Sequence, residues 1–340
     1  MAHPSEFGSL VRRDEIARLI EPYVKRRLDE HSAEWQAIIK RLHDRFSGPE
    51  PQGVQGLSEA PAGRALAAKL YTAAVTLRRR FLRRPWKPSG KAPARPATRK
   101  RTVKEVYEQR WAGRDGDARL FSDSTAKVEW GQQRLFVQSP AIKRVYLLYV
   151  YRLVARLAPK SVLEIGCGNG VNVALLANRF PDIAFRGVEL TAAGVDQGRR
   201  LCASALPAGL ADFSPEPLRS ETAHRRVRFD QGDAAHLPYA IGEFDLVITI
   251  LALEQMEKIR DAALRELARV CREHAVMIEP FRERNLDGLR QAYIRSRGYF
   301  SGSISELERY GLAPVFVATD FPAKAAEGVA VVLARKDAGG

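Results

Sequence analysis

The sequence predicts an α/β protein with a mostly parallel sheet covered by helices on both faces. From about residue 105 onward, short apolar runs alternate with segments of helical apolar spacing, as in folds built from strand–helix–strand units. One apolar run, at 162–165, leads directly into three glycines at alternate positions. The next apolar run ends in an acidic residue, Glu189. Together these observations favour a sheet whose carboxyl edge carries a ligand site.

Seven runs are expected to form strands, with helices between most of them. They span residues 161–165, 184–189, 226–230, 244–250, 275–280, 314–319 and 328–334. The spacing alone does not fix the order of these strands in the sheet.

The part of the chain before this pattern predicts helices. Apolar positions recur with helical spacing over 10–46, with a bend or break near Pro22. We therefore expect a helical N-terminal extension over 1–77, a basic Pro-rich linker over 78–104 and a catalytic domain over 105–340. The apolar stripe of the extension needs a partner inside or outside the chain, and a homodimer through these helices would supply one.

The net charge of +15 comes almost entirely from the linker. Residues 78–104 hold twelve Lys and Arg and no acidic residue, whereas residues 105–340 hold 32 basic and 30 acidic ones. The substrate of the catalytic part therefore need not be a polyanion. The basic segment itself could lie on an anionic membrane surface, bind RNA phosphates or form a plain solvated linker. Apolar residues beside it, with Trp86 within it, favour the membrane over nucleic acid.

Composition also bounds the compartment. Three cysteines at unrelated spacings predict neither a disulfide framework nor a zinc site, and the six histidines form no metal-ligand pattern. No apolar run is long enough to cross a bilayer. We expect a cytoplasmic protein, which the basic segment could bring to the inner face of a membrane.

The most specific motif is Val-Leu-Glu-Ile-Gly-Cys-Gly-Asn-Gly at 162–170. The apolar residues form a buried strand, and Gly166, Gly168 and Gly170 form a tight turn that lets backbone approach a ligand closely. Glu164 precedes the turn, where it can accept hydrogen bonds from an amine. This segment, with Cys167 inside the turn, resembles the first motif of class I S-adenosylmethionine (SAM)-dependent methyltransferases. The resemblance implies a Rossmann-like, seven-stranded, mostly parallel sheet with SAM as the cofactor.

Further motifs follow in the order that this family would place them. Glu189 and Leu190 end the second strand, where the carboxylate would accept the ribose hydroxyls. In the family's third motif, Asp233 would meet the adenine amino group and Ala234 would offer a backbone amide. Ile250 ends the strand that leaves the sheet over the cofactor. Upstream, Tyr107 and Trp111 resemble the aromatic residues of an N-terminal lid over SAM.

A nicotinamide-dependent enzyme is the nearest competitor for this pattern. Its fingerprint requires a glycine at position 171, where Val171 stands. It also gives no role to Glu164 or Asp233. The methyltransferase interpretation is therefore favoured.

The candidate catalytic residues are Glu254, which follows the fourth strand, and His236, which follows Asp233. Each could take a proton from a hydroxyl acceptor. The chain lacks both the Asn/Asp-Pro-Pro-Tyr/Phe motif of base-amine methylation and a Pro-Cys pair for cytosine C5. We therefore expect methyl transfer to a small-molecule, sugar or lipid-linked acceptor at oxygen. The alternatives are an RNA ribose methyltransferase using the basic arm, or a catalytically inactive methyltransferase-like binding protein.

Overall fold

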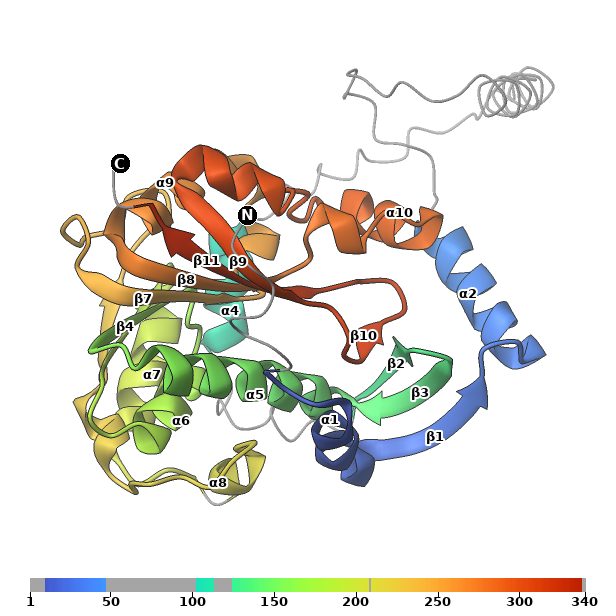
Figure 1. The fold of residues 1–340 in the computed structure, drawn as a ribbon, viewed down its shortest axis with the longest axis horizontal. Helices are drawn as coiled ribbons and strands as arrows, with labels where there is room; N and C mark the ends of the chain where they lie inside the picture. The colour runs from blue at the N-terminus through green and yellow to red at the C-terminus, as the bar shows by residue number, and fades with distance from the viewer. Residues whose placement is uncertain (1–9, 47–101, 113–123, 208, 338–340) are drawn as a thin grey trace, which may run out of the picture. The chain divides into compact units, whose positions relative to one another are not determined.

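The structure, a computed structural model, describes residues 10–46, 102–112, 124–207 and 209–337. Its centre is a seven-stranded sheet with the order β6-β5-β4-β7-β8-β11-β9 (Figure 1). All the neighbouring strands pair in parallel except β11, which is antiparallel to both β8 and β9. The strands are β4 (Ser161–Ile165), β5 (Ala184–Glu189), β6 (Arg228–Gln231), β7 (Phe244–Ile250), β8 (Cys271–Glu279), β9 (Leu312–Ala318) and β11 (Ala330–Lys336). The seven expected strands and the mostly parallel sheet are confirmed.

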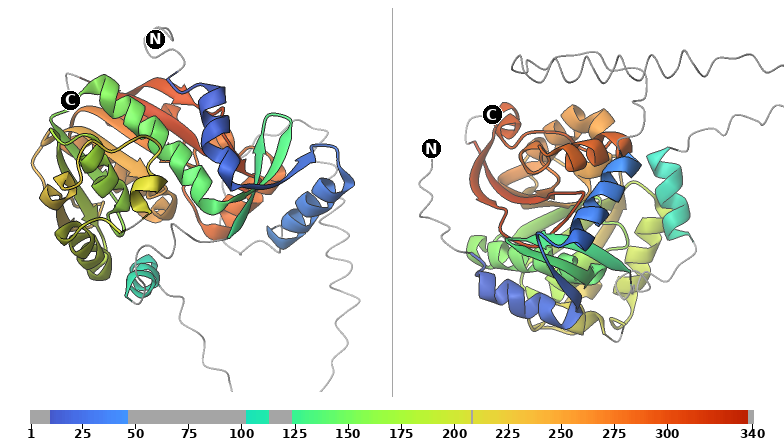
Figure 2. Two further views of the ribbon diagram at one scale, coloured as in Figure 1. Left: turned by 90° about the horizontal axis from the view of Figure 1, so that it is seen from below. Right: turned by 90° about the vertical axis from the view of Figure 1, so that its right-hand side faces the viewer.

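Helices cover both faces of this sheet, as the alternation of buried residues within each strand requires. In β7, Leu246 and Ile248 belong to the core shared with α5 and α6, whereas Val247 between them belongs to the core shared with α9. Figure 2 shows the same layers from two further directions. The helices of this part are α5 (Ser139–Leu157), α6 (Val171–Arg179), α7 (Ala192–Ala203), α8 (Leu210–Phe213), α9 (Arg260–Val270) and α10 (Gly288–Arg297). Short 3-10 turns are η3 (Ala223–Arg226), η4 (Leu253–Gln255), η5 (Glu257–Ile259), η6 (Arg282–Arg284) and η7 (Ser305–Tyr310).

A second, four-stranded antiparallel sheet has the order β1-β3-β2-β10. Its strands are β1 (Val24–Asp29), β2 (Thr125–Trp130), β3 (Gln133–Gln138) and β10 (Ala323–Lys324). The strand β10 lies in the connection between β9 and β11 and pairs with β2, with Lys324 opposite Val128. This sheet therefore ties the N-terminal part of the chain to a loop of the main sheet.

The N-terminal prediction was wrong for residues 24–29. The structure has α1 (Arg13–Ile20), a 3-10 turn η1 (Glu21–Tyr23), the strand β1 and then α2 (Ala33–Phe46). The break at Pro22 was expected, but pairing of β1 with β3 overrides the helical spacing after it. The apolar stripe finds its partner inside the chain: Ile16 and Ile20 join the core with α5, and Trp35 and Ile38 pack with Ala325.

Helix α4 (Val103–Trp111) begins inside the range 78–104 that was expected to be a linker. Thr102 caps this helix, because its side chain accepts from the Glu105 amide at 3.2 Å while the Glu105 carboxylate accepts from the Thr102 amide at 2.7 Å. The boundary expected at 77/78 lies outside the described residues. Within the described ranges, no helix is long and apolar enough to cross a membrane.

Candidate active site

The glycine turn after β4 has the geometry that the sequence predicts. Gly166, Gly168 and Gly170 all have positive φ, at 71°, 57° and 78°, a region that side chains disfavour. The amides of Gly166 and Cys167 donate to the Val188 carbonyl at 2.8 and 3.1 Å, which ties the turn to β5. A Cβ on Gly166 would lie 2.6 Å from the Ala252 Cβ. The turn therefore contacts the segment that follows β7.

Glu164 lies beneath this turn and is 2 % exposed. Its Oε1 accepts from Asn172 Nδ2 at 2.8 Å, while its buried Oε2 has no hydrogen-bond partner among the described residues. Burial raises the pKa of Glu164 to about 8, and the nearby Glu189 charge adds to this, against the hydrogen bond from Asn172. A buried carboxyl oxygen without a donor is suited to an ammonium group on a ligand.

Glu189 lies beside the turn at the end of β5 and is 7 % exposed. Its Oε2 accepts from the Gly168 amide at 3.2 Å. Its Oε1 accepts from Thr191, from the amide at 3.1 Å and from Oγ1 at 2.8 Å. This network holds the carboxylate at the carboxyl edge of the sheet, and Leu190 continues the chain from it.

The loop after β6 is joined to Glu189, because the Gly232 amide donates to the Glu189 carbonyl at 3.0 Å. The exposed Asp233 follows, with Oδ1 accepting from the Ala235 amide at 2.9 Å, and Ala234 is buried. Asp233 is therefore on the same edge as Glu189. The exposed His236 instead lies toward Glu266 of α9, a carboxylate whose pKa is lowered mainly by its hydrogen bond with Arg269.

Helix α4 covers the glycine turn. A Cβ on Gly168 would lie 2.9 Å from Trp111 Cζ2, and one on Gly194 would lie 3.1 Å from Trp111 Cδ1. The Glu108 carboxylate accepts from the Ala193 amide at 3.1 Å, and Gln197 donates to the Trp111 carbonyl. These contacts place Trp111 where a lid over the turn and the Glu189 edge would lie.

A tightly held turn follows β7 on the other side of the glycines. After Ile250, Leu251 has a φ of 52°, and η4 then presents Glu254. The carboxylate of Glu279, which is 0 % exposed, accepts from the amides of Ala252 at 3.0 Å, Leu253 at 3.1 Å and Glu254 at 3.1 Å. Burial, and next the charge of Glu254, raises the pKa of Glu279 to about 8. Glu279 thus fixes the main chain that carries Glu254.

Glu254 belongs to a group of polar and aromatic side chains from five elements or their loops, which we call the Glu254 cluster. Its members are Glu254, Tyr107 of α4, Tyr146 of α5, Tyr293 of α10, Lys324 of β10 and Glu327 of the segment after β10. We call β10 together with that segment the β10 loop. Burial, followed by the charge of Glu327, raises the pKa of Glu254 to about 7. A carboxyl group that titrates there can exchange a proton near neutral pH.

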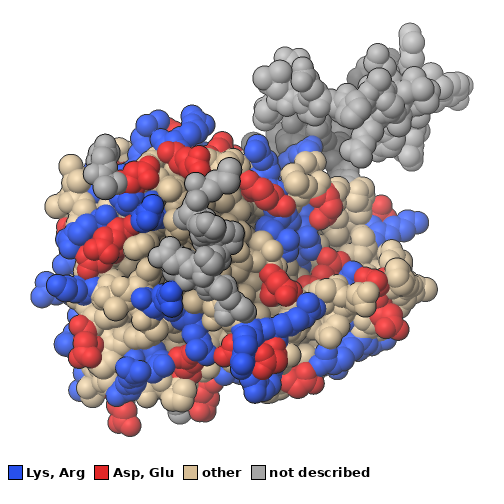
Figure 3. Space-filling view, in the orientation of Figure 1, with Lys and Arg blue, Asp and Glu red and all other residues tan. Residues whose placement is uncertain are grey.

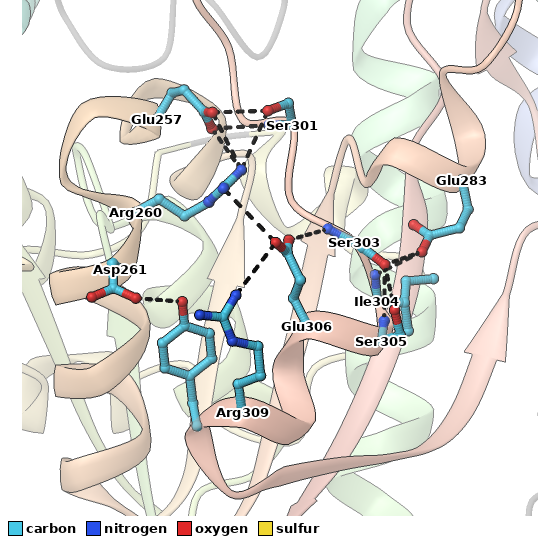
Figure 4. A network of polar contacts seen from close by, with 11 residues as sticks. Glu257, Arg260, Asp261, Glu283, Ser301, Ser303, Ile304, Ser305, Glu306 and Arg309 are labelled. Carbon is cyan, nitrogen blue, oxygen red and sulfur yellow. Dashed lines mark hydrogen bonds and ion pairs between the residues drawn. The ribbon is translucent and has the colours of Figure 1, made fainter. Parts of the chain in front are cut away.

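A polar network behind this cluster fixes the loop after α10 (Figure 4). The Ser301 amide and Oγ donate to Glu257 at 3.0 and 2.8 Å, and Arg260 donates to the same carboxylate at 3.2 Å. The Ser303 amide donates to Glu306 at 2.7 Å. Immediately before the first anchor, the Phe300 amide donates to the Glu254 carbonyl at 2.9 Å. This loop therefore holds the Glu254 main chain at its carbonyl, whereas Glu279 holds it at its amide.

The structure thus brings together most of the residues that the sequence predicts. The glycine turn, Glu164, Glu189, Asp233 and Glu254 share the carboxyl edge of the sheet, whereas His236 lies toward α9. Sequence reasoning missed Lys324 and Glu327, because no local pattern marks them. Glu279 was visible as an acidic residue at a strand end, but its role as a backbone anchor was not.

Comparison with known proteins agrees with this geometry. Residues 162–274 match the model of a methyltransferase domain family. They are a class I SAM-dependent methyltransferase domain. The chain is 33 % identical over 129 residues to norajmaline N-methyltransferase of Rauvolfia serpentina, covering 38 % of each protein. It is 33 % identical over 130 residues to a probable tocopherol O-methyltransferase of Oryza sativa subsp. japonica, covering 38 % of this chain and 31 % of that protein.

These matches cover only about a third of the length of the curated relatives. Among solved structures, magnesium protoporphyrin IX methyltransferase of Synechocystis PCC 6803, crystallised with bound SAH, aligns at 16 % identity and a TM-score of 0.47. That alignment covers 69 % of this chain and 98 % of the Synechocystis chain.

The cofactor of this domain family, SAM, fits the residues present. It carries an ammonium group, which would donate a hydrogen bond to the buried Oε2 of Glu164. That oxygen has no hydrogen-bond partner among the described residues. Glu189 would hold the two ribose hydroxyls of SAM, and Asp233 would hold its adenine. Glu164, Gly166, Cys167, Gly168, Gly170, Glu189, Leu190, Asp233, Ala234 and Ile250 are the predicted contact residues.

Proposed function

We propose that the protein transfers a methyl group from SAM to an oxygen of a small-molecule or lipid-linked acceptor. The observation that carries this proposal is the contact between the glycine turn and the Glu254 segment, where a Cβ on Gly166 would lie 2.6 Å from Ala252. That contact places the edge of the sheet that is predicted to bind SAM beside the segment of Glu254, whose carboxyl group is suited to proton transfer. The names of the relatives above, an N- and an O-methyltransferase of small molecules, support the acceptor class.

When bound, SAM supplies a methyl group on a sulfonium, which is already activated for in-line displacement. Glu164 would hold its ammonium group, Glu189 its ribose and Asp233 its adenine amino group. Glu254 would accept the acceptor's proton as the O–H bond breaks and the oxygen bonds to the methyl carbon. The sulfonium would supply the leaving group, because sulfur would keep the electron pair of the carbon–sulfur bond. The chain's main contribution is alignment of the two reactants.

The first test is binding of SAM, measured by calorimetry on the full chain. Glu189→Ala and Asp233→Ala should each weaken binding by about 1–3 kcal/mol, because each would leave a polar group of the ligand without its partner. Asp212→Ala, which removes an exposed carboxylate on α8, is the matched control and should leave the affinity unchanged. Unchanged affinity in both site variants would place the nucleoside elsewhere. No binding to the unaltered protein would favour a methyltransferase-like binding protein.

The acceptor can be sought with methyl-labelled SAM and fractionated metabolite and lipid extracts. A labelled product whose methyl group NMR places on oxygen, and which is not formed by Glu254→Gln, would support an oxygen acceptor and Glu254 as its base. Label on RNA would favour the ribose alternative. The face in Figure 3 interleaves Lys and Arg with Asp and Glu, a pattern more suited to a small acceptor than to a polyanion.

We also propose that residues 78–104, of which 78–101 lie outside the described ranges, attach the protein to anionic membrane surfaces at the cytoplasmic side. Flotation with anionic and neutral liposomes tests this: binding to both or neither would contradict it. A homodimer remains a further proposal, to be tested by sedimentation. Since α1 and α2 bury their apolar residues within the chain, that stripe no longer requires one.

A further inference from the structure

Glu327 is the most deeply buried charged group of the Glu254 cluster that the proposed reaction does not use. It follows β10, far along the chain from Glu254, and is 2 % exposed. Its Oε2 accepts from Lys324 Nζ at 2.6 Å. Its Oε1 is buried and receives no hydrogen bond from any donor of a described residue. A buried carboxylate oxygen in this state requires an explanation.

Glu254 offers one. The two carboxyl groups lie within hydrogen-bonding reach of each other, and this contact favours the protonated form of Glu254. Oε1 of Glu254 already accepts from Gln255 Nε2 at 2.8 Å. Two ionised carboxylates have no proton to share, but a protonated Glu254 can donate to Glu327 Oε1. One proton would then satisfy the oxygen that is otherwise without a donor.

The main chain holds both partners in place for this contact. The Glu327 amide donates to the Lys324 carbonyl at 3.1 Å, and the neighbouring Gly328 amide donates to Asn285 Oδ1 at 2.9 Å. Asn285 Nδ2 in turn donates to the Gly328 carbonyl at 2.8 Å. Glu254 is held by Glu279 and Phe300, as described above. The pair therefore does not depend on two flexible surface side chains meeting by chance.

We infer that Glu327 is a positioning residue. Once Glu254 has taken the proton of the acceptor, the protonated Glu254 carboxyl group donates a hydrogen bond to Glu327 Oε1. Lys324 donates to the other oxygen of Glu327, Oε2, so Oε1 stays available to accept from Glu254. Glu327 increases the basicity of Glu254 and orients the carboxyl group. The catalytic meaning of this inference rests on the function proposed above, but the pairing itself can be measured without an acceptor.

Other charged and titratable groups also face Glu254. Tyr107, Tyr146, Tyr293, Glu279 and Lys324 approach it from α4, α5, α10, β8 and the β10 loop. Of these, Lys324 acts in the opposite direction to Glu327, because its positive charge favours the ionised form of Glu254. Removing Lys324 and removing Glu327 should therefore shift the pKa of Glu254 in opposite directions.

The experiment is a pH titration of the full-length protein by infrared difference spectroscopy, with Glu254→Gln subtracted to isolate the Glu254 carboxyl signal. Glu327→Gln should lower the midpoint by about one pH unit, because it removes a negative charge and its amide can donate to ionised Glu254. Lys324→Met should raise the midpoint by a similar amount. Both variants break the same ion pair, so loss of structure alone would move them together.

Shifts in opposite directions support the inference. Shifts in the same direction, or an unmoved midpoint in either variant, would overturn it. Calorimetry with SAM on the same samples separates the two proposals, since the cofactor contacts lie elsewhere. Opposite shifts in a protein that does not bind SAM would support the Glu254–Glu327 pair and refute the proposed function.

Discussion

The carboxyl edge of the sheet that is predicted to bind SAM, here called the cofactor edge, lies beside the Glu254 cluster. The two regions are assembled in different ways. The cofactor edge comes from neighbouring strand ends, with Glu164 and Glu189 at the ends of β4 and β5 and Asp233 after β6. The Glu254 cluster draws side chains from α4, α5, α10, the turn after β7 and the β10 loop. The first can be read from local sequence because the parallel sheet places consecutive carboxyl ends together. The second exists only after the whole chain has packed.

The contact between Gly166 and Ala252 joins the two regions, and disrupting it should have the largest effect. Gly166→Ala would place an alanine at a φ of 71° with its Cβ 2.6 Å from that of Ala252. Left-handed strain of about 1–2 kcal/mol and overpacking of about 1–3 kcal/mol should lower the free energy of unfolding by about 2–5 kcal/mol. SAM binding should weaken as well. Chemical denaturation and calorimetry measure the two losses.

Gly242→Ala is the matched control for this change. Gly242 has a φ of 61°, but its Cβ would meet nothing closer than 3.9 Å. It should therefore cost only the backbone strain, and SAM affinity should be unchanged. Equal losses in the two variants would show that the two regions are not in close contact at Gly166.

The contrast also explains what sequence could and could not predict. All seven strands of the main sheet were found, and several of them, such as β7 and β11, are buried apolar runs, although β6 holds only one buried residue. The strand β1 was missed, since Val24 to Asp29 is mostly exposed and pairs with the distant β3. The hairpin of β2 and β3 did carry a signal: apolar residues alternate on both sides of Gly131, which has a φ of 55°.

The residues of the candidate site also differ in whether local sequence predicts their positions. Glu164 and Glu189 stand at the ends of apolar strands, so their positions on the edge follow from the fold class. Glu327 lies in a loop, and only the pairing of β10 with β2 and the Asn285 contacts bring it to Glu254. No spacing rule connects positions so far apart in the chain. The catalytic role predicted for His236 stays a prediction, and its exposed side chain lies toward α9.

A second prediction contrasts the proton chemistry of the two regions. The pKa of Glu164 is about 8, so in the free protein this carboxyl group is largely neutral at pH 7. Pairing with the SAM ammonium favours the ionised form, so binding at pH 7 should release a proton from Glu164. Affinity should rise from pH 6 to pH 8 by up to about tenfold per pH unit and level off above the free pKa. Calorimetry in two buffers of different ionisation enthalpy counts the released proton.

Glu164→Gln is the control, since it keeps the shape and the Asn172 contact region but cannot ionise. It should bind more weakly, with no release of this proton and a flatter pH dependence. Glu254→Gln should retain the full pH dependence of the unaltered protein. If Glu254→Gln removed it instead, the ammonium group would lie in the Glu254 cluster and the assignment of the two regions would be reversed.

The smallest effect is expected at the helix that touches both regions. Through Trp111 α4 covers the glycine turn, and through Tyr107 it reaches Glu254. Trp111→Ala should speed SAM dissociation by about fivefold, near 1 kcal/mol, because it removes the indole cover while the Glu108–Ala193 contact still holds the helix. Val106→Ala, on the same helix and 43 % exposed in its native form, should leave the rate unchanged. Stopped-flow displacement measures both rates. If Val106→Ala matched Trp111→Ala, the effect would come from helix stability, and α4 would be a structural support of the site and not its lid.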